Sequence, residues 1–271
     1  MLGRAVVAEV RQRGGEALGP SRAEADVTDR DTLVALAREF RPEVVINCAA
    51  FTRVDDCESR EDHAMAVNGE GARNAAAAAA DVGARLIHLS TDYVFDGQAR
   101  TPYREDAPPN PQSAYGRSKL AGERAVAGYQ EALIVRVSWL FGPGGPSFPA
   151  TMVRLMQEGQ RTLRVVDDQV GGPTYTLFLA RALCDLFRAG ASGIVHYQNQ
   201  EPVSWYGFTR AIVRQWDPTV EVLPVSTAEF SRPAPRPAYS ALDIHRCQAI
   251  LGRPVEPWSA GLTEFLRSIQ P

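Results

Sequence analysis

Short apolar runs alternate along the chain with helical stretches, and this alternation limits the fold more than any other feature. Residues 44–50, 85–90 and 133–137 are apolar and rich in branched side chains, which is typical of buried parallel strands. Between them, residues 63–82 and 114–129 have the length and composition of helices. This spacing predicts an α/β fold, a Rossmann-like doubly wound parallel sheet.

The pattern changes after a loop rich in glycine and proline at residues 142–146. Ligands bind doubly wound sheets at the carboxyl ends of the strands, so a following lobe is expected to close over that edge. We therefore expect a dinucleotide-binding domain of residues 1–142, to which 167–195 return, and a smaller substrate-binding lobe of residues 143–166 and 196–271. The helices expected after residue 142 span residues 147–159, 174–188 and 204–216.

Charge and apolar pattern exclude several classes of partner. The 271 residues carry a net charge of −3, so no bulk positive field attracts nucleic acid or an anionic membrane. No apolar run reaches the ~18 residues that span a bilayer. Charged side chains interrupt the N-terminus, unlike a signal peptide. Four cysteines far apart, without C-x-x-C spacing, indicate reduced thiols in a cytoplasmic protein.

The start of the chain departs from the expected sheet. A dinucleotide-binding sheet opens with a strand, a glycine-rich turn and a helix, whereas this chain runs directly into an amphipathic helix at about residues 3–13. Gly3 fits the last glycine of such a turn. Either the recorded start is internal to a longer protein or the chain is a shortened one. A shortened chain is expected to bind cofactor weakly and fold poorly, because a strand edge stays exposed.

One lysine, Lys119, stands among 29 basic residues, the others being arginine. Lysine is a compact point charge, whereas arginine is a wide, permanently charged fork. Tyr115 precedes Lys119 by four residues on a predicted helix, so both side chains share one face. A fixed positive charge lowers the pKa of a nearby phenol and suits it to proton transfer. The alternative for this Y-x-x-x-K pattern alone is an exposed helix face.

Two hydroxyl side chains, Ser90 and Thr91, follow directly on a predicted strand. Side chains at the carboxyl end of a central strand lie where a ligand binds. Either hydroxyl can donate a hydrogen bond to a substrate carbonyl and polarise it. The alternative is a helix cap or local turn made by the same residues.

Several motifs together make the chain resemble the dTDP-4-dehydrorhamnose reductase family of extended short-chain dehydrogenases/reductases. The resemblance extends over essentially the whole chain, and the family's first strand has no counterpart in it. The matching stretches are NCAAFT at residues 47–52 with Val54 and Asp55, STDYVFDG at 90–97, Pro102 and Tyr103 with Glu105 and Asp106, YGRSKLAGE at 115–123, RVSWLFG at 136–142, DQVGGPT at 168–174 and RPAYSALD at 236–243.

The resemblance implies a division of catalytic work. Tyr115 is the general acid that protonates the sugar oxygen. Lys119 lowers the pKa of Tyr115 and hydrogen-bonds the nicotinamide ribose, and Thr91 holds the C4 carbonyl. Hydride moves to C4 of dTDP-4-dehydro-6-deoxy-L-mannose, giving dTDP-L-rhamnose.

The resemblance also assigns binding residues around this centre. Trp139 matches an aromatic residue at the sugar, although a tryptophan in this position is by itself more typical of a core, and Arg236 is a candidate for the diphosphate. The cofactor-binding set implied is Gly3, Asp26, Val27, Ala49, Ala50, Thr52, Tyr115 and Lys119. The substrate-binding set implied is Thr91, Phe95, Tyr115, Trp139 and Arg236.

The choice of cofactor follows from the stretch after the expected second strand. Residues 18–22 contain no acid to accept the adenosine ribose hydroxyls, which disfavours NADH. Arg22 and Arg4 can meet a 2′-phosphate. We expect NADPH, with NADH as the alternative cofactor, and no catalytic metal.

Other functions on the same fold stay open. Y-x-x-x-K also serves epimerases and other nucleotide-sugar reductases, and a non-catalytic regulatory subunit of methionine adenosyltransferase resembles the same family. The expected partner is a nucleotide sugar, and the expected state is a monomer or weak homodimer.

Overall fold

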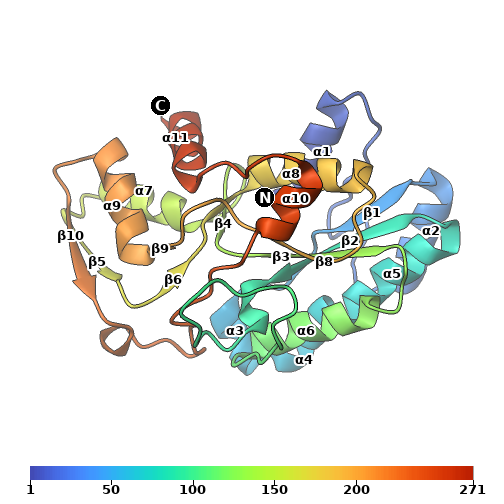
Figure 1. Ribbon diagram of the computed structural model, residues 1–271, viewed down its shortest axis with the longest axis horizontal. Coiled ribbons are helices and arrows are strands. Elements are labelled where there is room, and N and C mark those ends of the chain that lie inside the picture. Colours follow the sequence, from blue (N-terminus) through green and yellow to red (C-terminus); the bar gives the residue numbers. More distant parts are fainter. Residues whose placement is uncertain (271) are drawn as a thin grey trace.

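Four parallel strands form the centre of the molecule in a computed structural model that describes residues 1–270. Their order in the sheet is β1-β2-β3-β8 (Figure 1). The register places Thr91, the last residue of β2, opposite Val137, the last of β3. The prediction of an α/β parallel sheet is confirmed. The strands are β1 (Val44–Asn47), β2 (Arg85–Thr91), β3 (Ala132–Val137) and β8 (Gly193–Tyr197).

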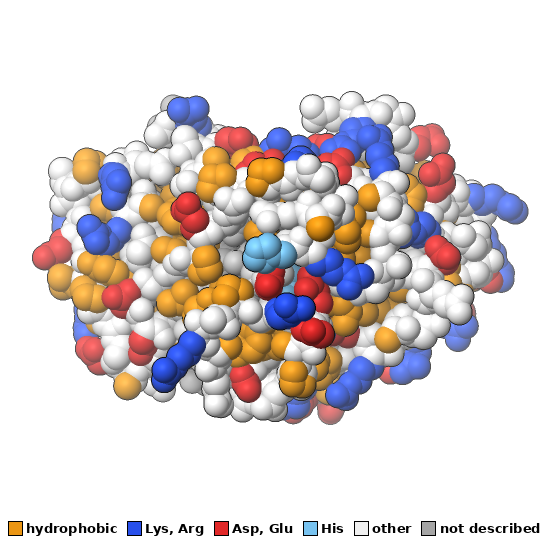
Figure 2. Space-filling model, in the orientation of Figure 1, with side chains coloured by type: hydrophobic (Ala, Val, Ile, Leu, Met, Phe, Trp, Pro, Cys, Tyr) orange, Lys and Arg blue, Asp and Glu red, His pale blue; other side chains and the backbone are white. Residues whose placement is uncertain are grey.

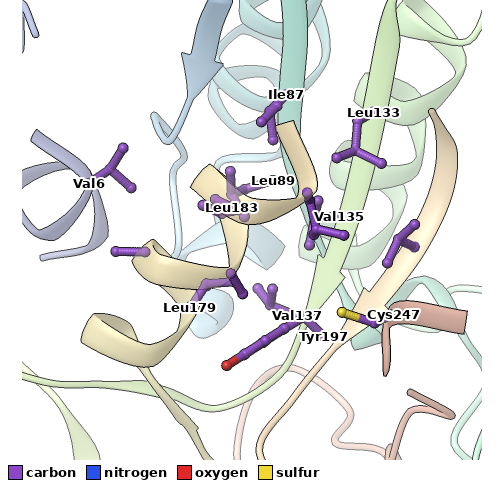
Figure 3. Packing of buried hydrophobic residues seen from close by; sticks show 14 of the residues in the cluster. Val6, Ile87, Leu89, Leu133, Val135, Val137, Leu179, Leu183, Tyr197 and Cys247 are labelled. Atoms are coloured by element: carbon purple, nitrogen blue, oxygen red, sulfur yellow. The ribbon is translucent and has the colours of Figure 1, made fainter. Parts of the chain in front are cut away.

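Helices cover both faces of this sheet, because the strand side chains alternate between the faces. Ile87 and Leu89 pack in one cluster with Leu183 (Figure 3), whereas Leu86 packs in another with Ala75. The first face is covered by α1 (Leu2–Gln12), α8 (Thr176–Arg188) and α10 (His245–Leu251). The second is covered by α5 (Gly71–Val82) and α6 (Ala114–Val126), with α2 (Arg30–Phe40) packed on α5.

The alanine-rich run lies in α5 and supplies a close contact with the sheet. Ala72, Ala75 and Ala79 are buried against Leu86 and Ile134. Short side chains let the helix axis approach the strands, which explains the low-complexity sequence.

A second group of elements packs around its own apolar cluster beside the sheet (Figure 1). Phe208, Phe265 and Met152 belong to this cluster. The elements are β4 (Leu140–Phe141), α7 (Phe148–Gln157), β5 (Thr162–Val166), β6 (Val170–Gly171), β7 (Thr174–Tyr175), β9 (Val203–Ser204), α9 (Trp205–Trp216), β10 (Glu221–Val225), the 3₁₀-helix η3 (Thr227–Glu229) and α11 (Trp258–Ile269). Strand β4 pairs with β7, β5 with β10, and β6 with β9.

Short helical pieces connect the first two strands and follow the second. They are α3 (Val54–Ser59), α4 (Glu61–Ala64), the π-helix η1 (Met65–Glu70) and the 3₁₀-helix η2 (Asp92–Val94). The helix expected at 63–82 is thus one continuous helical run with a π-helical turn inside it.

Two elements end earlier than the sequence predicted. The strand expected to reach residue 50 ends at Asn47, because the Asn47 side chain accepts the Ala49 N–H at 3.1 Å and turns the chain. The helix expected to reach residue 129 ends at Val126.

The surface charges, the helices and the cysteines bear on the classes of partner considered from the sequence. Acidic and basic side chains are interspersed on the face shown in Figure 2. Within residues 1–270, no helix is long and apolar enough to cross a membrane, and no His, Cys, Asp and Glu side chains group as metal ligands. The four cysteines in this part of the chain are free thiols.

Candidate active site

Helix α6 places Tyr115 and Lys119 at the carboxyl edge of the sheet. The helix begins where the Ser113 hydroxyl accepts the Gly116 N–H at 3.1 Å, so Tyr115 lies in its first turn. Lys119 is 2 % exposed, and its ammonium donates to the Leu89 carbonyl at 2.5 Å. This hydrogen bond fixes the lysine beside the end of β2.

Thr91 is the hydroxyl that the structure brings to Tyr115. The Tyr115 phenol lies in polar contact with the Thr91 side chain. Ser90 is instead occupied, since its hydroxyl donates to the buried Glu123 carboxylate at 2.5 Å. The Thr91 hydroxyl also donates to a carboxylate, that of Asp92 at 2.9 Å. The proximity of Thr91 to Tyr115 is therefore what favours Thr91 of the two hydroxyls left open by the sequence. Thr91 also accepts the Tyr93 N–H at 3.2 Å, so the capping alternative holds as well.

Burial decides the protonation of Tyr115 and Lys119. It raises the pKa of the Tyr115 phenol well above its ordinary value, and the Thr91 contact offsets this only in part. Burial lowers the pKa of Lys119 to about 8, with Glu123 acting in the opposite direction. The sequence led us to expect a lowered pKa for Tyr115; in this structure desolvation outweighs any neighbouring charge, and the phenol stays protonated.

The residues expected at the cofactor gather at the end of β1. Ala49 and Thr52 are exposed and Ala50 is half-buried, directly after the strand. Gly3, in the first turn of α1, faces the same place: a Cβ there would lie 3.7 Å from Cys48 Cβ. The first turn of α1 has no side-chain cap, so its N–H groups are available to an anion.

Val27 and Asp26, the two residues expected beside an adenine, differ in their surroundings. Val27 is buried against Gly71, whose missing Cβ would lie 2.7 Å from Val27 Cγ1. Asp26 is half-buried and forms an ion pair with Arg22 at 2.9 Å. Two hydrogen bonds from Thr28, and to a smaller extent this ion pair, lower the pKa of Asp26 to about 2. Arg4 lies apart from that pair, next to Gly144 after β4.

Two expected substrate residues reach the same edge of the sheet. Trp139 follows the end of β3 by two residues and is half-buried. Arg236 forms an ion pair with Asp55 at 2.9 Å, which ties the C-terminal segment to the start of α3. Its charge also acts on Tyr93, whose ring packs edge-to-face on Tyr115 at 5.5 Å.

Phe95 lies in the loop after β2 and is buried, as Thr91 and Tyr115 are. Its ring is 2 % exposed and stacks on Tyr103 at 4.3 Å, with the Arg136 guanidinium 5.0 Å from its centroid. These contacts support the loop after β2, and the assignment of Phe95 to the substrate stays a prediction. An aromatic residue near a motif gives no signal in the sequence for which way it points.

Asn68, which was not predicted as a site residue, lies in the π-helix η1 and is 1 % exposed. Its side-chain oxygen accepts the Phe51 N–H at 2.8 Å, and its amide donates to the Phe51 carbonyl at 3.1 Å. The same amide donates to the Ser118 hydroxyl at 2.8 Å, next to Lys119. Asn68 therefore connects the loop after β1 with α6. Asn68 is the one polar side chain among residues 64–69, and this was the available signal.

A buried ion pair behind the site was also missed. Arg136 on β3 donates to both oxygens of Glu123 on α6, at 2.8 and 2.7 Å. The pair holds Ser90 and hence the end of β2 against the helix that carries Lys119. Both side chains are almost fully buried, so removal of one would leave the other charge unpaired.

A parallel sheet with Thr91, Tyr115 and Lys119 together at its carboxyl edge defines the class: a Rossmann-like short-chain dehydrogenase/reductase.

Comparison with known proteins narrows the class. The family model described as RmlD substrate binding domain matches residues 1–270. The chain is 44% identical to a dTDP-4-dehydrorhamnose reductase of Streptomyces griseus over 97% of this chain and 89% of that protein. It is 41% identical to a dTDP-4-keto-6-deoxy-D-glucose reductase of Streptomyces niveus over 97% and 92%.

A solved relative agrees in fold. The dTDP-4-dehydrorhamnose reductase of Bacillus anthracis, in complex with NADP, has a TM-score of 0.94 and 36% identity, and covers 98% of this chain and 95% of that chain. The chain belongs to the dTDP-4-dehydrorhamnose reductase family and is an NAD(P)H-dependent oxidoreductase.

Proposed function

We propose that this chain reduces the C4 keto group of dTDP-4-dehydro-6-deoxy-L-mannose to the alcohol of dTDP-L-rhamnose, using NADPH. The observation that carries the proposal is the contact between Thr91 and a buried, protonated Tyr115, with Lys119 one helical turn away. A carbonyl reductase needs a hydroxyl that orients the carbonyl and an acid that supplies a proton. Both groups meet here.

The residues at the end of β1 fit the cofactor. The uncapped first turn of α1, with Gly3 in it, suits a diphosphate, and the exposed Ala49 and Thr52 leave the backbone accessible beside it. NADPH, when bound, supplies the hydride that adds to C4. Arg22 is the cation assigned to the 2′-phosphate, with Asp26 and Val27 beside the adenine, whereas Arg4 lies next to Gly144, apart from this group. NADP in the Bacillus anthracis relative supports this choice over NADH.

The protein residues orient the carbonyl and move one proton. Thr91 exchanges its hydrogen bond to the Asp92 carboxylate for one to the C4 oxygen and holds the carbonyl next to Tyr115. As negative charge develops on that oxygen, the Tyr115 Oη–H bond breaks and its proton passes to the oxygen, which completes the alcohol. The Lys119 ammonium stabilises the phenolate that remains, and Tyr115 regains a proton from solvent.

The substrate is held by the part of the chain beside the sheet. Trp139 contacts the sugar, and Arg236 exchanges its contact with Asp55 for the diphosphate. Residues 143–166 and 196–271 form the substrate lobe, and 1–142 with 167–195 the cofactor domain. The two apolar clusters support this division for most of their residues. The exceptions are Tyr197, Cys247 and Val255, which pack with the sheet, and Phe141, Tyr175 and Phe178, which pack in the second cluster. The protein acts in the cytoplasm as a monomer or weak homodimer.

The test is oxidation of NADPH by the purified chain with the L-mannose-configured keto sugar generated in the same reaction. Turnover that yields dTDP-L-rhamnose supports the proposal. The Streptomyces niveus relative makes dTDP-4-keto-6-deoxy-D-glucose the second substrate to offer. Preference for that sugar would move the assignment to a reductase of other stereochemistry. Isomerisation of a nucleotide sugar without NADPH oxidation would indicate an epimerase instead.

Absence of turnover with either sugar, together with specific capture of a methionine adenosyltransferase, would favour the non-catalytic alternative.

A further inference from the structure

Trp139 has a backbone conformation that a tryptophan rarely adopts. Its φ is 44°, in the left-handed region that favours glycine. A bulky residue keeps such a conformation only where its neighbours determine it, and such positions concentrate at functional sites. The Trp139 carbonyl is fixed by the Thr174 N–H at 3.1 Å, where β4 and β7 begin their pairing.

Two neighbours from other elements fix the indole itself. Trp205, the first residue of α9, stacks on it with ring centroids 3.4 Å apart and planes 5° apart. Gly171 of β6 packs against it so closely that a Cβ there would lie 2.5 Å from Trp139 Cε2. Phe148 of α7 contacts Trp205 at 4.4 Å. The indole of Trp139 is thus held by side chains and backbone that lie far away in sequence.

The held indole keeps a free polar group at the edge of the active site. Among residues 1–270, Trp139 Nε1 forms no hydrogen bond, whereas Trp258 Nε1 donates to the Glu201 carbonyl at 2.7 Å. Trp139 follows β3, whose last residue lies opposite Thr91 in the sheet. An indole N–H and an apolar ring edge at this place suit a hexose, which offers hydroxyl acceptors and C–H faces.

We infer that Trp205 is a positioning residue for sugar recognition: its stacking holds Trp139 in the left-handed conformation that presents the indole to the hexose of the substrate. The inference rests on the proposed function, because it takes the sugar to bind at the Thr91 edge. Trp205 acts through Trp139 and does not touch the reacting atoms. Loss of Trp205 therefore weakens sugar binding and leaves the proton transfer by Tyr115 intact.

The experiment compares Trp205→Leu, Trp139→Ala and the double variant in steady-state kinetics. Trp205→Leu is expected to raise KM for the nucleotide sugar about fivefold to tenfold while kcat stays within about twofold, as expected for one lost aromatic contact. In the Trp139→Ala background the same substitution is expected to add nothing, because its effect passes through Trp139. Additive effects on KM would overturn the inference.

A spectroscopic readout separates this role from general packing and needs no turnover. Two stacked indoles couple their transitions and give an exciton couplet in far-ultraviolet circular dichroism. The couplet is expected to vanish in Trp205→Leu and in Trp139→Ala. Trp216→Leu, at the other end of α9, is the matched control and keeps both the couplet and the KM.

The outcomes distinguish failure of the inference from failure of the proposed function. If the unmodified chain turns over no keto sugar, the proposed function fails; the couplet then still reports the stack, and the assignment of that stack to sugar recognition fails with the function. If the unmodified chain turns over the sugar and Trp205→Leu, still folded by its thermal midpoint, keeps the original KM, the inference alone is wrong. An equal rise in KM in Trp216→Leu would likewise reduce the effect to packing of α9.

Discussion

Asp92 and Lys119 lie buried beside the Thr91–Tyr115 contact, and burial moves their pKa values in opposite directions. Burial raises the pKa of Asp92 to about 6 and lowers that of Lys119 to about 8. In both cases the neutral form is favoured, because a charge loses more hydration than the protein restores. The pKa values of both groups therefore lie close to neutral pH, where their titration affects both stability and activity.

Asp92 makes stability depend on pH. The ordinary pKa of Asp is about 3.9. The folded state binds this proton more tightly than the unfolded chain, so Asp92 lowers the free energy of unfolding as pH rises from about 4 to about 6. Asp92→Asn lacks this loss, and relative to the unmodified chain it should gain roughly 2–3 kcal/mol between pH 4 and pH 7. Urea unfolding of both proteins at the two pH values measures the gain; an equal difference at both would refute the assignment.

Lys119 sets the alkaline side of the activity profile. Its charge is required to stabilise the Tyr115 phenolate, so kcat/KM should fall as pH rises above about 8. The phenol of Tyr115 titrates well above this range and does not produce the same limb. A pH–rate series on the unmodified chain and on Lys119→Met checks this. The variant should be much slower, and its kcat/KM should not fall near pH 8. A fall that persists in the variant would mean that another group causes it.

At the scale of elements, the site depends on how closely α6 approaches the π-helix η1. Gly69 faces Ala121, and Gly122 faces the Asn68 backbone, so small residues occupy both sides of the contact. This approach lets the Asn68 amide reach both Phe51 and Ser118. The loop after β1 and the helix that carries Lys119 are consequently fixed to each other.

Gly122→Ala should separate these two elements. Its Cβ would lie 2.3 Å from the Asn68 carbonyl oxygen, and backbone cannot yield as a flexible side chain can. Overpacking of this kind costs about 1–3 kcal/mol, and we expect kcat to fall as well. Gly128→Ala is the control, since no atom lies within 4 Å of its Cβ. Chemical denaturation and kinetics of both variants test the contact; equal stability of the two would contradict it.

At the scale of the whole molecule, local sequence signals predicted the layers better than the contacts between them. The short apolar runs predicted β1, β2 and β3, and the lone lysine with Tyr115 predicted the centre of the site. The stacking of Phe95 on Tyr103 was not predicted, because sequence spacing does not show which way a loop side chain points.

The supporting contacts could not be predicted, because they join residues far apart in sequence. Trp139 meets Trp205 and Arg136 meets Glu123 only once the strands and helices are assembled. The pKa of Tyr115 differed from expectation for the same reason. Desolvation depends on everything packed around the phenol, whereas the sequence shows only the neighbouring lysine.

The most direct test of the central claim compares NADPH oxidation by the unmodified chain and by Tyr115→Phe, with dTDP-4-dehydro-6-deoxy-L-mannose as substrate. Loss of the phenolic proton should lower kcat by about 10²–10⁴-fold, with a smaller change in the KM for the sugar. The ring is kept, so its packing against Tyr93 should keep the variant folded. A Tyr115→Phe enzyme that keeps the original kcat would contradict the assignment of Tyr115 as the proton donor, and with it this account of the site.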